Sequence, residues 1–495
     1  MFHFSFPADK NFSILFYFLF RILIFVLTAF PLSGQGLLLD DLEYEKQHKF
    51  PTYDEGNKAE LESLKGIYKI DLKPFCPEPQ DQGFIASCTG WASGYGALTI
   101  LQAIKNGWSG QKALITENAF SSLFIYNQIK KGSCEFGAYM TDAAILIRDK
   151  GDVLSKNYDK LKNKCDRTPS EQELKDAQVF RIKDFMTIFG TSDPDIVKVQ
   201  RTKMSLAQNK PIVIGISLLR NFQNLALGSE YWYPTIGDTT SFGGHSMVVI
   251  GFDDGKEAFE VMNSWGPGWG NKGFIWIKYR DFGKYTQYGY VFIPENEKFH
   301  FFDITASLMI RQPTYLEENV LAFNDVQVIW KSGFYELTKG SSKNGDLLQP
   351  LVIEAKRDSY LYAFSVDSKN NIKVHWPRDA IFDSNFLGNH ESAIIAFSPV
   401  NLYIPGKYSA LRVGTIGNEY WCFLISGKPI TDLNVYLKAL QFNQTSDFNK
   451  RMKKVFGPAL LSSDRIKYSA DKMQAESDMT EEEIVPIILK IKVGN

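Results

Sequence analysis

The sequence predicts an α+β protein in which a helical lobe packs against a β lobe and a second, strand-rich domain follows. Three observations support this class. Helical periodicity fills residues 88–151, short β-rich runs separated by Gly, Asp and Pro fill residues 211–279, and further strand-like runs follow residue 298. The polar segment 294–298 marks the boundary between the two domains.

The composition is that of an ordinary globular protein. The 495 residues include 55 Lys and Arg against 56 Asp and Glu, and 44% are hydrophobic. These values exclude a disordered chain, a collagen-like fibre and a polytopic membrane protein. A net charge near zero also argues against nucleic acid as the main partner. At about 150 residues per domain, the length suggests two or three domains.

The N-terminus carries an apolar run over residues 11–32, with Arg21 near its centre. The stretch 22–30 has the length of a secretory signal core, and small residues follow at 33–36. The alternative is an uncleaved membrane anchor over residues 11–32, but Arg21 would cost roughly 2.5–3.5 kcal/mol at the centre of a bilayer. We therefore expect a signal peptide over 1–35 and a secreted or periplasmic protein. Membrane contact is expected only if this segment stays uncleaved.

Residues 36–69 are polar and mixed, which suits a mobile lead-in segment. A helix is expected to begin at Cys88, because Trp91, Tyr95, Leu98 and Leu101 then share one stripe. Two more helices are expected to follow in this lobe, with Thr116 and Thr141 as their N-caps and a stop at Gly151. The first domain is expected to span residues 70–296.

Strands dominate the rest of the chain. In the first domain they are expected at 211–218, 245–252, 259–263 and 273–279. In the second domain, residues 297–495, they are expected at 304–310, 358–367, 371–376, 410–416, 420–426 and 486–493. Only residues 431–456 look helical there, and 463–483 is polar and turn-rich. This pattern predicts an all-β sandwich.

Cys88 is the first candidate for chemistry, because a thiol in the first turn of a helix meets backbone N–H groups and the positive end of the helix dipole. Gln82, six residues upstream, can place its amide beside the Cys88 backbone N–H. Two such donors would form an oxyanion hole for acyl transfer. Taken alone, Cys88 would more often be a buried structural cysteine than a nucleophile.

His245 and Asn263 strengthen the case for catalysis. His245 follows two glycines at the start of one predicted strand, and Asn263 ends the next strand along the chain. Because such strands pair side by side, Asn263 can reach the imidazole, fix its tautomer and direct the other ring nitrogen at a thiol. The indole of Trp265 can shield that hydrogen bond from water.

In this order, the three segments resemble the papain-like cysteine peptidases over residues 70–295, which implies a two-lobed fold with a substrate cleft. By this resemblance Cys88 is the nucleophile, His245 the general base and acid, Asn263 its orienter and Gln82 an oxyanion donor. The stretch 134–137 resembles the family's cleft-lining loop, so Gly137 would pair with the backbone of an extended substrate. For Gly137, a simple loop glycine is the alternative.

The sequence also departs from the family pattern. Ile85 stands where a disulfide cysteine is usual, Thr89 replaces an aromatic residue, and Phe136 replaces a glycine of the cleft. The segment 35–69 is too short for the long helices of an inhibitory pro-region of the plant or lysosomal type. These departures concern activation and substrate range, while the four polar groups of the catalytic pattern are all present.

The chain has five cysteines. Cys134 and Cys165 lie in the helical lobe and are expected to form a disulfide, with Cys76 as the competing partner. An oxidising compartment would allow such a bond to persist. Cys422, in an apolar strand of the second domain, is expected to be a buried thiol.

The second domain resembles, more weakly, a β-sandwich module appended to bacterial caspase-like and papain-like peptidases, through the runs 358–367 and 420–426. His375 and His390 lack metal-ligand spacing and are expected to be solvated or core histidines, so the sequence implies no metal and no cofactor.

Two functions remain open from the sequence. The first is a secreted cysteine peptidase of bacterial type, acting on protein or peptide substrates through a thiolate and imidazolium pair and a covalent acyl-enzyme. The alternative is an inactive papain-like scaffold that binds surface polymers or proteins through its β-sandwich. Within the enzymes, a transpeptidase is also possible, because acyl transfer to water and to an amine share one intermediate.

Overall fold

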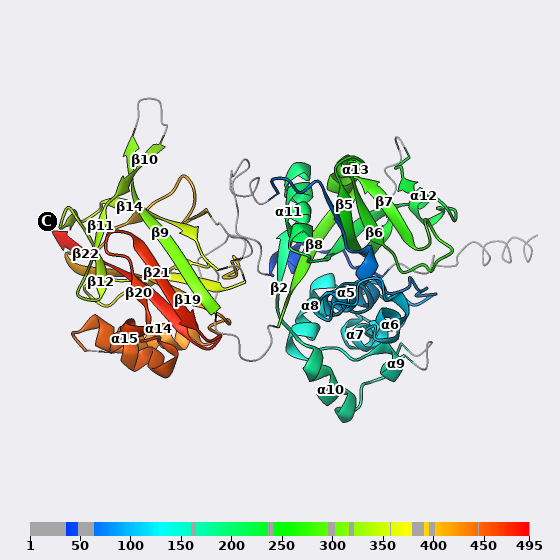
Figure 1. The fold of residues 1–495 in the computed structure, drawn as a ribbon, viewed down its shortest axis with the longest axis horizontal. Coiled ribbons are helices and arrows are strands. Elements are labelled where there is room, and N and C mark those ends of the chain that lie inside the picture. The colour runs from blue at the N-terminus through cyan, green and yellow to red at the C-terminus, as the bar shows by residue number, and fades with distance from the viewer. Residues whose placement is uncertain are drawn as a thin grey trace, which may run out of the picture.

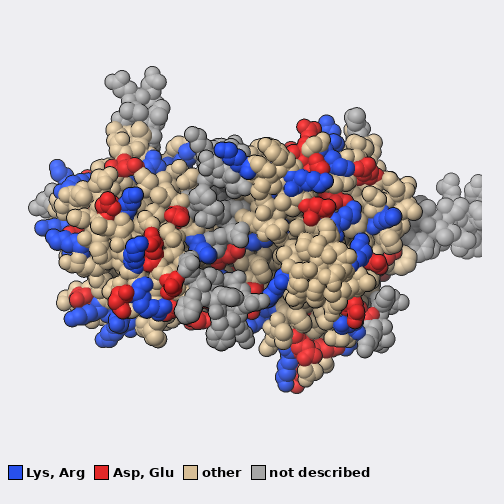
Figure 2. All heavy atoms as spheres, viewed as in Figure 1, with Lys and Arg blue, Asp and Glu red and all other residues tan. Residues whose placement is uncertain are grey.

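The computed structural model describes residues 36–47, 64–159, 165–235, 237, 241–295, 302–315, 321–356, 358–378, 391–395, 401–443 and 445–494. Figure 1 shows two bodies side by side, one formed by the chain up to residue 295 and one by the chain after residue 302. The predicted signal segment 1–35 and the predicted boundary at 296–297 lie outside the described residues. Acidic and basic side chains are interspersed on the face of the molecule drawn in Figure 2.

The helical lobe of the first domain is built around the helix that begins at Cys88. This helix continues without a break from α4 through a π-helical stretch into α5, and contains neither Pro nor a charged residue before Lys105. The helices of the lobe are α4 (Cys88–Gly90), η2 (Trp91–Leu98), α5 (Thr99–Lys105), α6 (Lys112–Glu117), α7 (Ser122–Ile129), α8 (Met140–Asp149), α9 (Ser155–Tyr158) and α10 (Glu171–Ala177).

Small residues allow the Cys88 helix to pack closely against both lobes. A Cβ on Gly90 would lie 2.2 Å from the carbonyl oxygen of Ser122 in α7, and one on Gly96 would lie 2.5 Å from Val248 in β5. Because neither neighbour leaves room for a side chain, the helix is held at backbone distance between α7 and β5. This packing sets Cys88 at the junction of the two lobes.

The β lobe is one antiparallel-rich sheet with the order β2-β8-β3-β5-β6-β7-β4, and β1 pairs with β5. Strands β3 and β5 run antiparallel with Ile216 opposite His245, and β5 pairs with β6. The strands are β1 (Lys69–Asp71), β2 (Ile182–Phe189), β3 (Ile212–Leu219), β4 (Tyr231–Trp232), β5 (Ser241–Asp253), β6 (Ala258–Met262), β7 (Phe274–Lys278) and β8 (Thr286–Pro294). Helices α11 (Asp195–Ala207), α12 (Arg220–Gln223) and α13 (Tyr279–Tyr285) accompany it. The four strands predicted in this domain are thus confirmed as β3, β5, β6 and β7.

The second body contains two seven-stranded sheets in the described part of the chain. The first has the order β17-β14-β9-β21-β20, with β10 on β9 and β18 on β14, and comprises β9 (Phe302–Tyr315), β10 (Leu321–Val326), β14 (Leu347–Glu354), β17 (Leu402–Tyr403), β18 (Leu411–Arg412), β20 (Lys467–Tyr468) and β21 (Met473–Met479). The second has the order β11-β12-β22-β19-β15-β16, with β13 on β22, and comprises β11 (Val328–Lys331), β12 (Phe334–Leu337), β13 (Ser342–Lys343), β15 (Tyr360–Val366), β16 (Ile372–Trp376), β19 (Gly417–Ser426) and β22 (Ile484–Gly494). Helices α14 (Leu433–Phe442) and α15 (Phe448–Phe456) occupy the stretch predicted to be helical.

Polar contacts join the two bodies. The Lys210 ammonium lies 2.7 Å from a carboxylate oxygen of Asp358, and Lys183 donates to the Asp358 carbonyl at 3.0 Å. The Tyr360 hydroxyl donates to Asp184 at 3.2 Å. Lys210 lies two residues before β3, the strand that pairs with β5.

The N-terminal lead-in was predicted to be mobile, and for residues 36–47 that prediction is wrong. This segment packs on the first domain and contains a short helix, α2 (Asp41–Glu45), which is N-capped by the Asp40 side chain. The Tyr44 side chain is only 3% exposed, and its hydroxyl accepts the Gly289 N–H at 3.0 Å. Burial of one aromatic ring therefore anchors a stretch that looks polar in the sequence.

Three local expectations also differ from the structure. Thr116 lies inside α6, while the next helix, α7, is capped by Ser121. Thr141 lies in the first turn of α8, whose N-cap is Tyr139, although the helix does end just before Gly151. The stretch 463–483 holds β20 and β21, where alternate burial of Met473, Ala475 and Met479 shows a strand with one polar face.

Among the described residues, no helix combines the length and the apolar character needed to cross a bilayer. The apolar run 11–32 lies outside the described residues.

Candidate active site

Cys88 begins the central helix, as the sequence predicts, and Ser87 is the residue at its N-cap. The Cys88 side chain has no exposed surface. The neighbouring strand β5 supplies Ser246, whose backbone hydrogen-bonds the sulfur, and Thr89 lies 3.5 Å from the Ser246 hydroxyl. The sulfur therefore lies at the junction of the two lobes, one residue along β5 from His245.

His245 and Asn263 meet in the way the strand pairing predicts. β5 and β6 are adjacent, with Val248 opposite Met262, and His245 Nε2 lies 2.7 Å from Asn263 Oδ1. The same oxygen accepts the backbone N–H of Ser264 at 2.8 Å, which identifies it as the amide oxygen. Because an amide oxygen can only accept, the proton of the neutral imidazole must lie on Nε2.

The other ring nitrogen of His245, Nδ1, like Asn263 Nδ2, is a buried atom of the site without a partner among the described residues. With the proton on Nε2, Nδ1 presents an unused lone pair. A buried polar atom without a partner is costly, so it points to a role that the resting structure does not satisfy.

Aromatic rings close this site against water. The Trp265 indole lies 4.6 Å from the His245 ring, centroid to centroid, and packs in turn against Phe222 and Trp269. Phe222 is fully buried. Trp265 therefore covers the bond between His245 and Asn263, as predicted.

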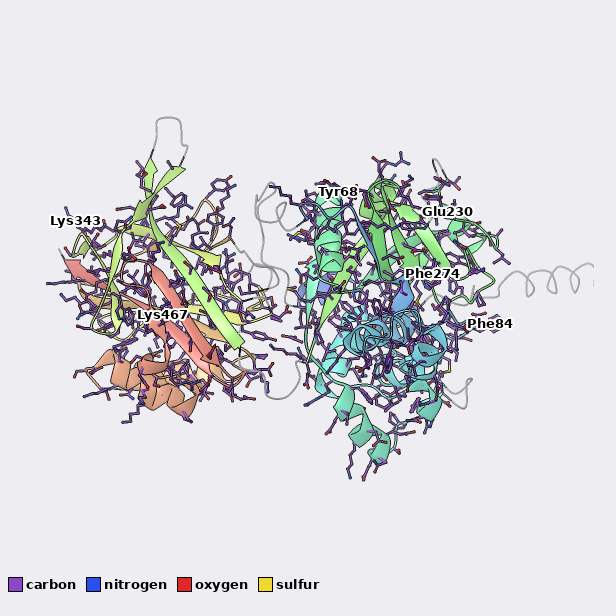
Figure 3. All side chains as sticks on the ribbon, in the orientation of Figure 1. Tyr68, Phe84, Glu230, Phe274, Lys343 and Lys467 are labelled. Atoms are coloured by element: carbon purple, nitrogen blue, oxygen red, sulfur yellow. A yellow bond between two sulfur atoms is a disulfide. The ribbon has the colours of Figure 1, made fainter. Side chains whose placement is uncertain are left out.

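Gln82 is held by Ser264, a residue that the sequence analysis did not single out. The Ser264 hydroxyl donates to Gln82 Oε1 at 2.6 Å, and Gln82 N donates to the Ser264 carbonyl at 2.8 Å. Because the amide oxygen is fixed, Gln82 Nε2 points toward the loop that precedes the Cys88 helix. There it donates to the Ile85 carbonyl at 2.9 Å. In the same loop, Phe84 points away from the body and is 85% exposed (Figure 3). The position of Ser264 between Asn263 and Trp265 was the only signal for it.

The groove between the lobes holds a segment of the chain itself, Gly36–Leu39, hereafter the strap. From the helical lobe, Ala138 N donates to Gly36 O at 2.8 Å and Ala138 O accepts from Leu38 N at 3.1 Å. From the β lobe, Gly244 O accepts from Leu37 N at 3.3 Å. The strap thus runs parallel to Ala138 and antiparallel to Gly244, as an added strand between the two walls.

Glycines make the groove wide enough for this strap. A Cβ would lie 2.2 Å from the Gly36 carbonyl oxygen if placed on Gly137, and 2.5 Å from the Leu37 carbonyl oxygen if placed on Gly244. On Gly215 it would lie 2.8 Å from the Leu37 side chain. Leu37 itself is 5% exposed. The groove therefore accepts an extended backbone and one apolar side chain.

Contacts beyond the groove fix the strap in place. Asp41 accepts hydrogen bonds from the hydroxyls of Thr191 and Tyr288, both at 2.7 Å. The Tyr44 ring stacks on Tyr288 with centroids 4.2 Å apart. The strap is thus continuous with an anchored segment rather than a loose end of the chain.

Burial sets the protonation of both reactive groups, and the strap contacts Cys88 through the Gly36 backbone. Desolvation raises the pKa of the Cys88 thiol, against opposing hydrogen bonds from the backbones of Ser246 and Gly36. Desolvation also lowers the pKa of His245 to about 4, against the hydrogen bond with Asn263. At neutral pH the covered site therefore holds a neutral thiol and a neutral imidazole. The position of Cys88 at a helix N-terminus predicts a lowered thiol pKa. In the covered state that prediction is wrong, because burial outweighs the helix and raises the pKa.

Gly137 and the disulfide lie on one wall of the groove. Gly137 O accepts from Lys131 N at 3.1 Å, and the backbone that pairs with the strap is that of the next residue, Ala138. Cys134 and Cys165 are joined in a disulfide with Cα atoms 5.6 Å apart, and Cys76 is a free buried thiol. No cluster of His, Cys, Asp and Glu among the described residues could hold a metal ion.

Comparison with known proteins finds a family match within the first domain. Residues 78–290 match the family described as "Papain family cysteine protease". This match lies within the first domain and covers less than half of the 495 residues. The enzyme class of this domain is therefore that of the cysteine-type peptidases, which are hydrolases, and the two-lobed α+β fold predicted for it is confirmed.

Several known proteins are similar to part of this chain. The chain is 27% identical over 229 residues to "Uncharacterized peptidase C1-like protein L477" of Acanthamoeba polyphaga mimivirus, over 44% of this chain and 70% of the viral protein. It is 22% identical to "Cysteine proteinase EP-B 1" of Hordeum vulgare, over 40% of this chain and 50% of the barley protein. The chain thus spans half the length of that plant relative.

Solved structures match the same region. Xylellain, a cysteine protease from Xylella fastidiosa, is 25% identical with a TM-score of 0.42, over 53% of this chain and 97% of that protein. Bromelain from Ananas comosus, in complex with the E64 inhibitor, is 18% identical with a TM-score of 0.36, over 46% of this chain and 99% of that protein.

Proposed function

We propose that the first domain is an active peptidase that hydrolyses peptide bonds, with Cys88 as nucleophile, His245 as general base and acid, and Asn263 as its orienter. One observation carries the proposal: His245 Nδ1 is buried without a partner, while Asn263 holds the proton on Nε2. An imidazole in this tautomer can accept a thiol proton at Nδ1. The only neighbouring thiol at the start of a helix in the described domain is that of Cys88.

The reaction then follows from these groups. His245 Nδ1 takes the proton of the Cys88 thiol, and the sulfur adds to the carbonyl carbon of the substrate peptide bond. The oxyanion forms beside the Cys88 backbone N–H and the Gln82 amide, whose orientation Ser264 fixes. His245 gives its proton to the leaving amine as the C–N bond breaks, which leaves a thioester on Cys88. Water, deprotonated by His245, hydrolyses the thioester.

The strap suggests how a peptide substrate lies in the groove. Its backbone pairs with both walls and its Leu37 side chain fills the space beside Gly215. A protein or peptide substrate in extended form would use the same walls, with Gly137 and Trp265 beside it. Strap and substrate would compete for one groove, so turnover requires that the strap leave.

The cellular setting is part of the same proposal. A disulfide between Cys134 and Cys165 suits an oxidising compartment, as does a signal peptide over residues 1–35. We therefore place the protein in the secreted or periplasmic class of bacterial type. The second domain, with its two sheets, is then an appended β-sandwich module.

The alternative is an inactive scaffold that binds partners through the second domain. Complete burial of Cys88 favours the inactive scaffold, because a covered nucleophile cannot react. The two functions differ in what happens when the strap is removed from the groove. A peptidase gains activity, and a scaffold does not.

A peptide library tests the choice. Full-length protein and its Gly36→Ala variant, in which a Cβ would lie 1.8 Å from the Ala86 carbonyl oxygen, are incubated with mixed peptides and the products identified by mass spectrometry. A thiol-directed epoxide is added in parallel. Cleavage that the epoxide and Cys88→Ala both remove supports the peptidase. Absence of both cleavage and an epoxide adduct on Cys88 in the Gly36→Ala protein would favour the scaffold, and products joined to an added amine would indicate a transpeptidase.

A further inference from the structure

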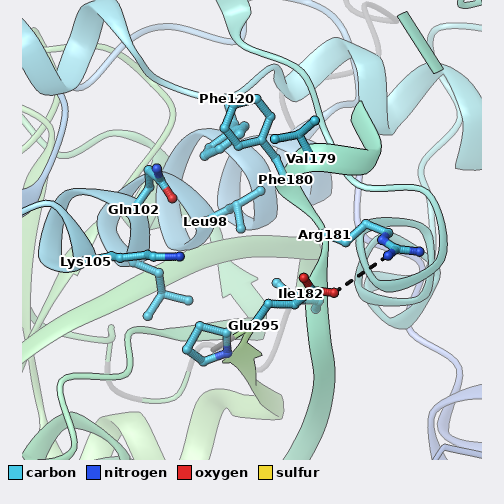
Figure 4. A pocket seen from close by; sticks show the side chains of 11 residues that line it. Leu98, Gln102, Lys105, Phe120, Val179, Phe180, Arg181, Ile182 and Glu295 are labelled. Atoms are coloured by element: carbon cyan, nitrogen blue, oxygen red, sulfur yellow. Dashed lines mark ion pairs between the residues drawn. The ribbon is translucent and has the colours of Figure 1, made fainter. Parts of the chain in front are cut away.

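A second hollow lies at the far end of the helix that begins at Cys88. It has a volume of about 310 Å³, which is in the range of small-molecule sites. Its walls come from the last turns of that helix, from the turn before β2 and from the end of β8 (Figure 4). Leu98, the nearest lining residue on the helix, is ten residues from Cys88, or about 15 Å along the axis. The hollow is therefore separate from the groove.

One stripe of the helix forms the first wall. Leu98, Leu101, Gln102 and Lys105 all line the hollow and follow the spacing of one helical face. The stripe is apolar toward its start and polar toward its end. This wall thus offers an apolar contact and a cation at opposite ends of one face.

The opposite wall is aromatic below and charged at the mouth. Phe120 is 1% exposed and meets the Phe180 ring edge-on, with centroids 5.1 Å apart, and Ile182 is 2% exposed. Val179 stands at the mouth with 77% of its surface exposed. An apolar ligand entering here would cover a side chain that now faces water.

The charges at the mouth favour an anion. Lys105 makes no ion pair within the part of the chain that the structure describes, and it lies beside Gln102 on one side of the hollow (Figure 4). Across the hollow, Arg181 and Glu295 are 3.9 Å apart and 44% and 49% exposed, so their mutual attraction is weak. The two cations, Lys105 and Arg181, face one carboxylate, that of Glu295, so the lining of the hollow carries one positive charge in excess.

We propose that this hollow is a binding site for a small apolar monocarboxylate, either a free acid or the C-terminal residue of a short peptide. The apolar body packs against Leu101, Val179 and Phe180, and the carboxylate accepts hydrogen bonds from Lys105 and Gln102. A single negative charge matches the single excess cation. The proposal does not rest on the peptidase function, because binding can be measured without turnover.

The test uses full-length protein carrying Cys88→Ala, so that peptides stay intact. Heteronuclear NMR titration compares 4-phenylbutyrate with uncharged 4-phenylbutanamide, and N-acetyl-phenylalanine with its amide. We expect a Kd on the order of 0.1–1 mM for at least one acid, as fits a ligand of about a dozen heavy atoms, and at least fivefold weaker binding of its amide. The two pairs distinguish a free acid from a peptide terminus. Equal binding of acid and amide, or binding of neither acid, would overturn the proposal.

Two variants locate the site, and a third serves as control. Lys105→Gln should weaken the binding of the acid about fivefold and leave the binding of the amide unchanged, as expected for the loss of one exposed charge contact. Gln102→Trp should fill the hollow and remove binding of both. Lys175→Gln makes the same charge change on α10 of the same lobe, outside the hollow, and should have no effect. An equal loss of affinity in Lys175→Gln and Lys105→Gln would assign the effect to net charge and contradict the site.

Discussion

Among the described residues each domain buries one histidine, and the comparison between them separates a candidate reactive site from a packed core. His245 bonds Asn263 at 2.7 Å and His375 bonds the Ser365 hydroxyl at 2.8 Å. Burial lowers the pKa of His245 to about 4, and burial together with Lys373 lowers that of His375 to about 3. Burial and a low pKa are therefore common to both.

The difference lies in what surrounds the rings. His245 has an orphaned Nδ1, a partner that can only accept, and a cysteine at a helix start across the lobe junction. His375 pairs with a hydroxyl, which can donate or accept, and its nearest described ring neighbour is Trp421 at 6.3 Å. A histidine thus becomes a candidate base through its fixed tautomer and its unpaired nitrogen, rather than through burial.

The largest expected effect is the loss of turnover on removing either reactive group. Cys88→Ala and His245→Ala should each lower kcat by at least about 10⁴-fold, because nucleophile and base act as a unit. The matched variant His375→Ala should keep kcat and lose about 1–3 kcal/mol of stability, since it leaves the Ser365 hydroxyl buried without a partner. Peptide turnover and urea unfolding measure the two properties. If the His375→Ala protein were fully folded but had lost turnover, the proposed difference between the two histidines would be wrong.

The next effect concerns the network that only His245 possesses. Gln82→Ala should lower kcat by on the order of 10²–10³ with little change in KM, because its amide is expected to act on the transition state. Ser264→Ala should lower kcat about tenfold, since the Gln82 amide can then rotate, and Ser264→Thr should restore most of it. Steady-state kinetics in the Gly36→Ala background provide the values. Unchanged kcat in Gln82→Ala would show that the oxyanion role is wrong.

How much of this could be predicted depends on whether a feature is local. Cys88, His245 and Asn263 could be proposed from the sequence because each lies in a short motif and the three motifs follow one another in a characteristic order. The disulfide between Cys134 and Cys165 was expected from their shared lobe, and the structure contains it.

The features that were missed are tertiary. Three leucines after Gly36 show no periodicity, so nothing local indicates that Leu37 lies in the groove. The Ser264 contact joins residues 182 positions apart. Strand β21 is different, because alternation of Met473, Ala475 and Met479 was visible in the sequence and was obscured by the polar residues between them.

A smaller effect is expected from opening the groove. Gly36→Ala should displace the strap and increase the rate of Cys88 alkylation by iodoacetamide about tenfold, which corresponds to roughly 1.4 kcal/mol of lost closure. Gly268→Ala is the matched control, because a Cβ on Gly268 meets nothing within 4 Å. Alkylation is followed by mass spectrometry. Equal rates in both variants would show that the strap does not protect the thiol.

Acid should open the groove by a still smaller amount. Burial in the closed state lowers the pKa of His245 to about 4. In the open state we expect its pKa to return to the ordinary value of about 6.5, so protonation of His245 favours opening as the pH falls between these two values. Hydrogen exchange at Leu38 and Ala138, corrected for intrinsic pH effects, should therefore speed up from pH 6.5 to 4. Core amides around His375 should keep their protection until nearer pH 3. Simultaneous loss of protection in both regions would indicate global unfolding instead.

The pH dependence of Cys88 alkylation in the Gly36→Ala variant tests the central claim most directly. With the groove open, the helix N-terminus and a protonated His245 should stabilise the thiolate, so that reactivity reaches half of its maximum below pH 7. In the unsubstituted protein, where the strap is in place, Cys88 should react slowly and only in alkali, because burial raises the pKa of the covered thiol. An open variant whose Cys88 becomes reactive only above about pH 8, as a free cysteine does, would mean that no ion pair forms and would contradict the peptidase mechanism.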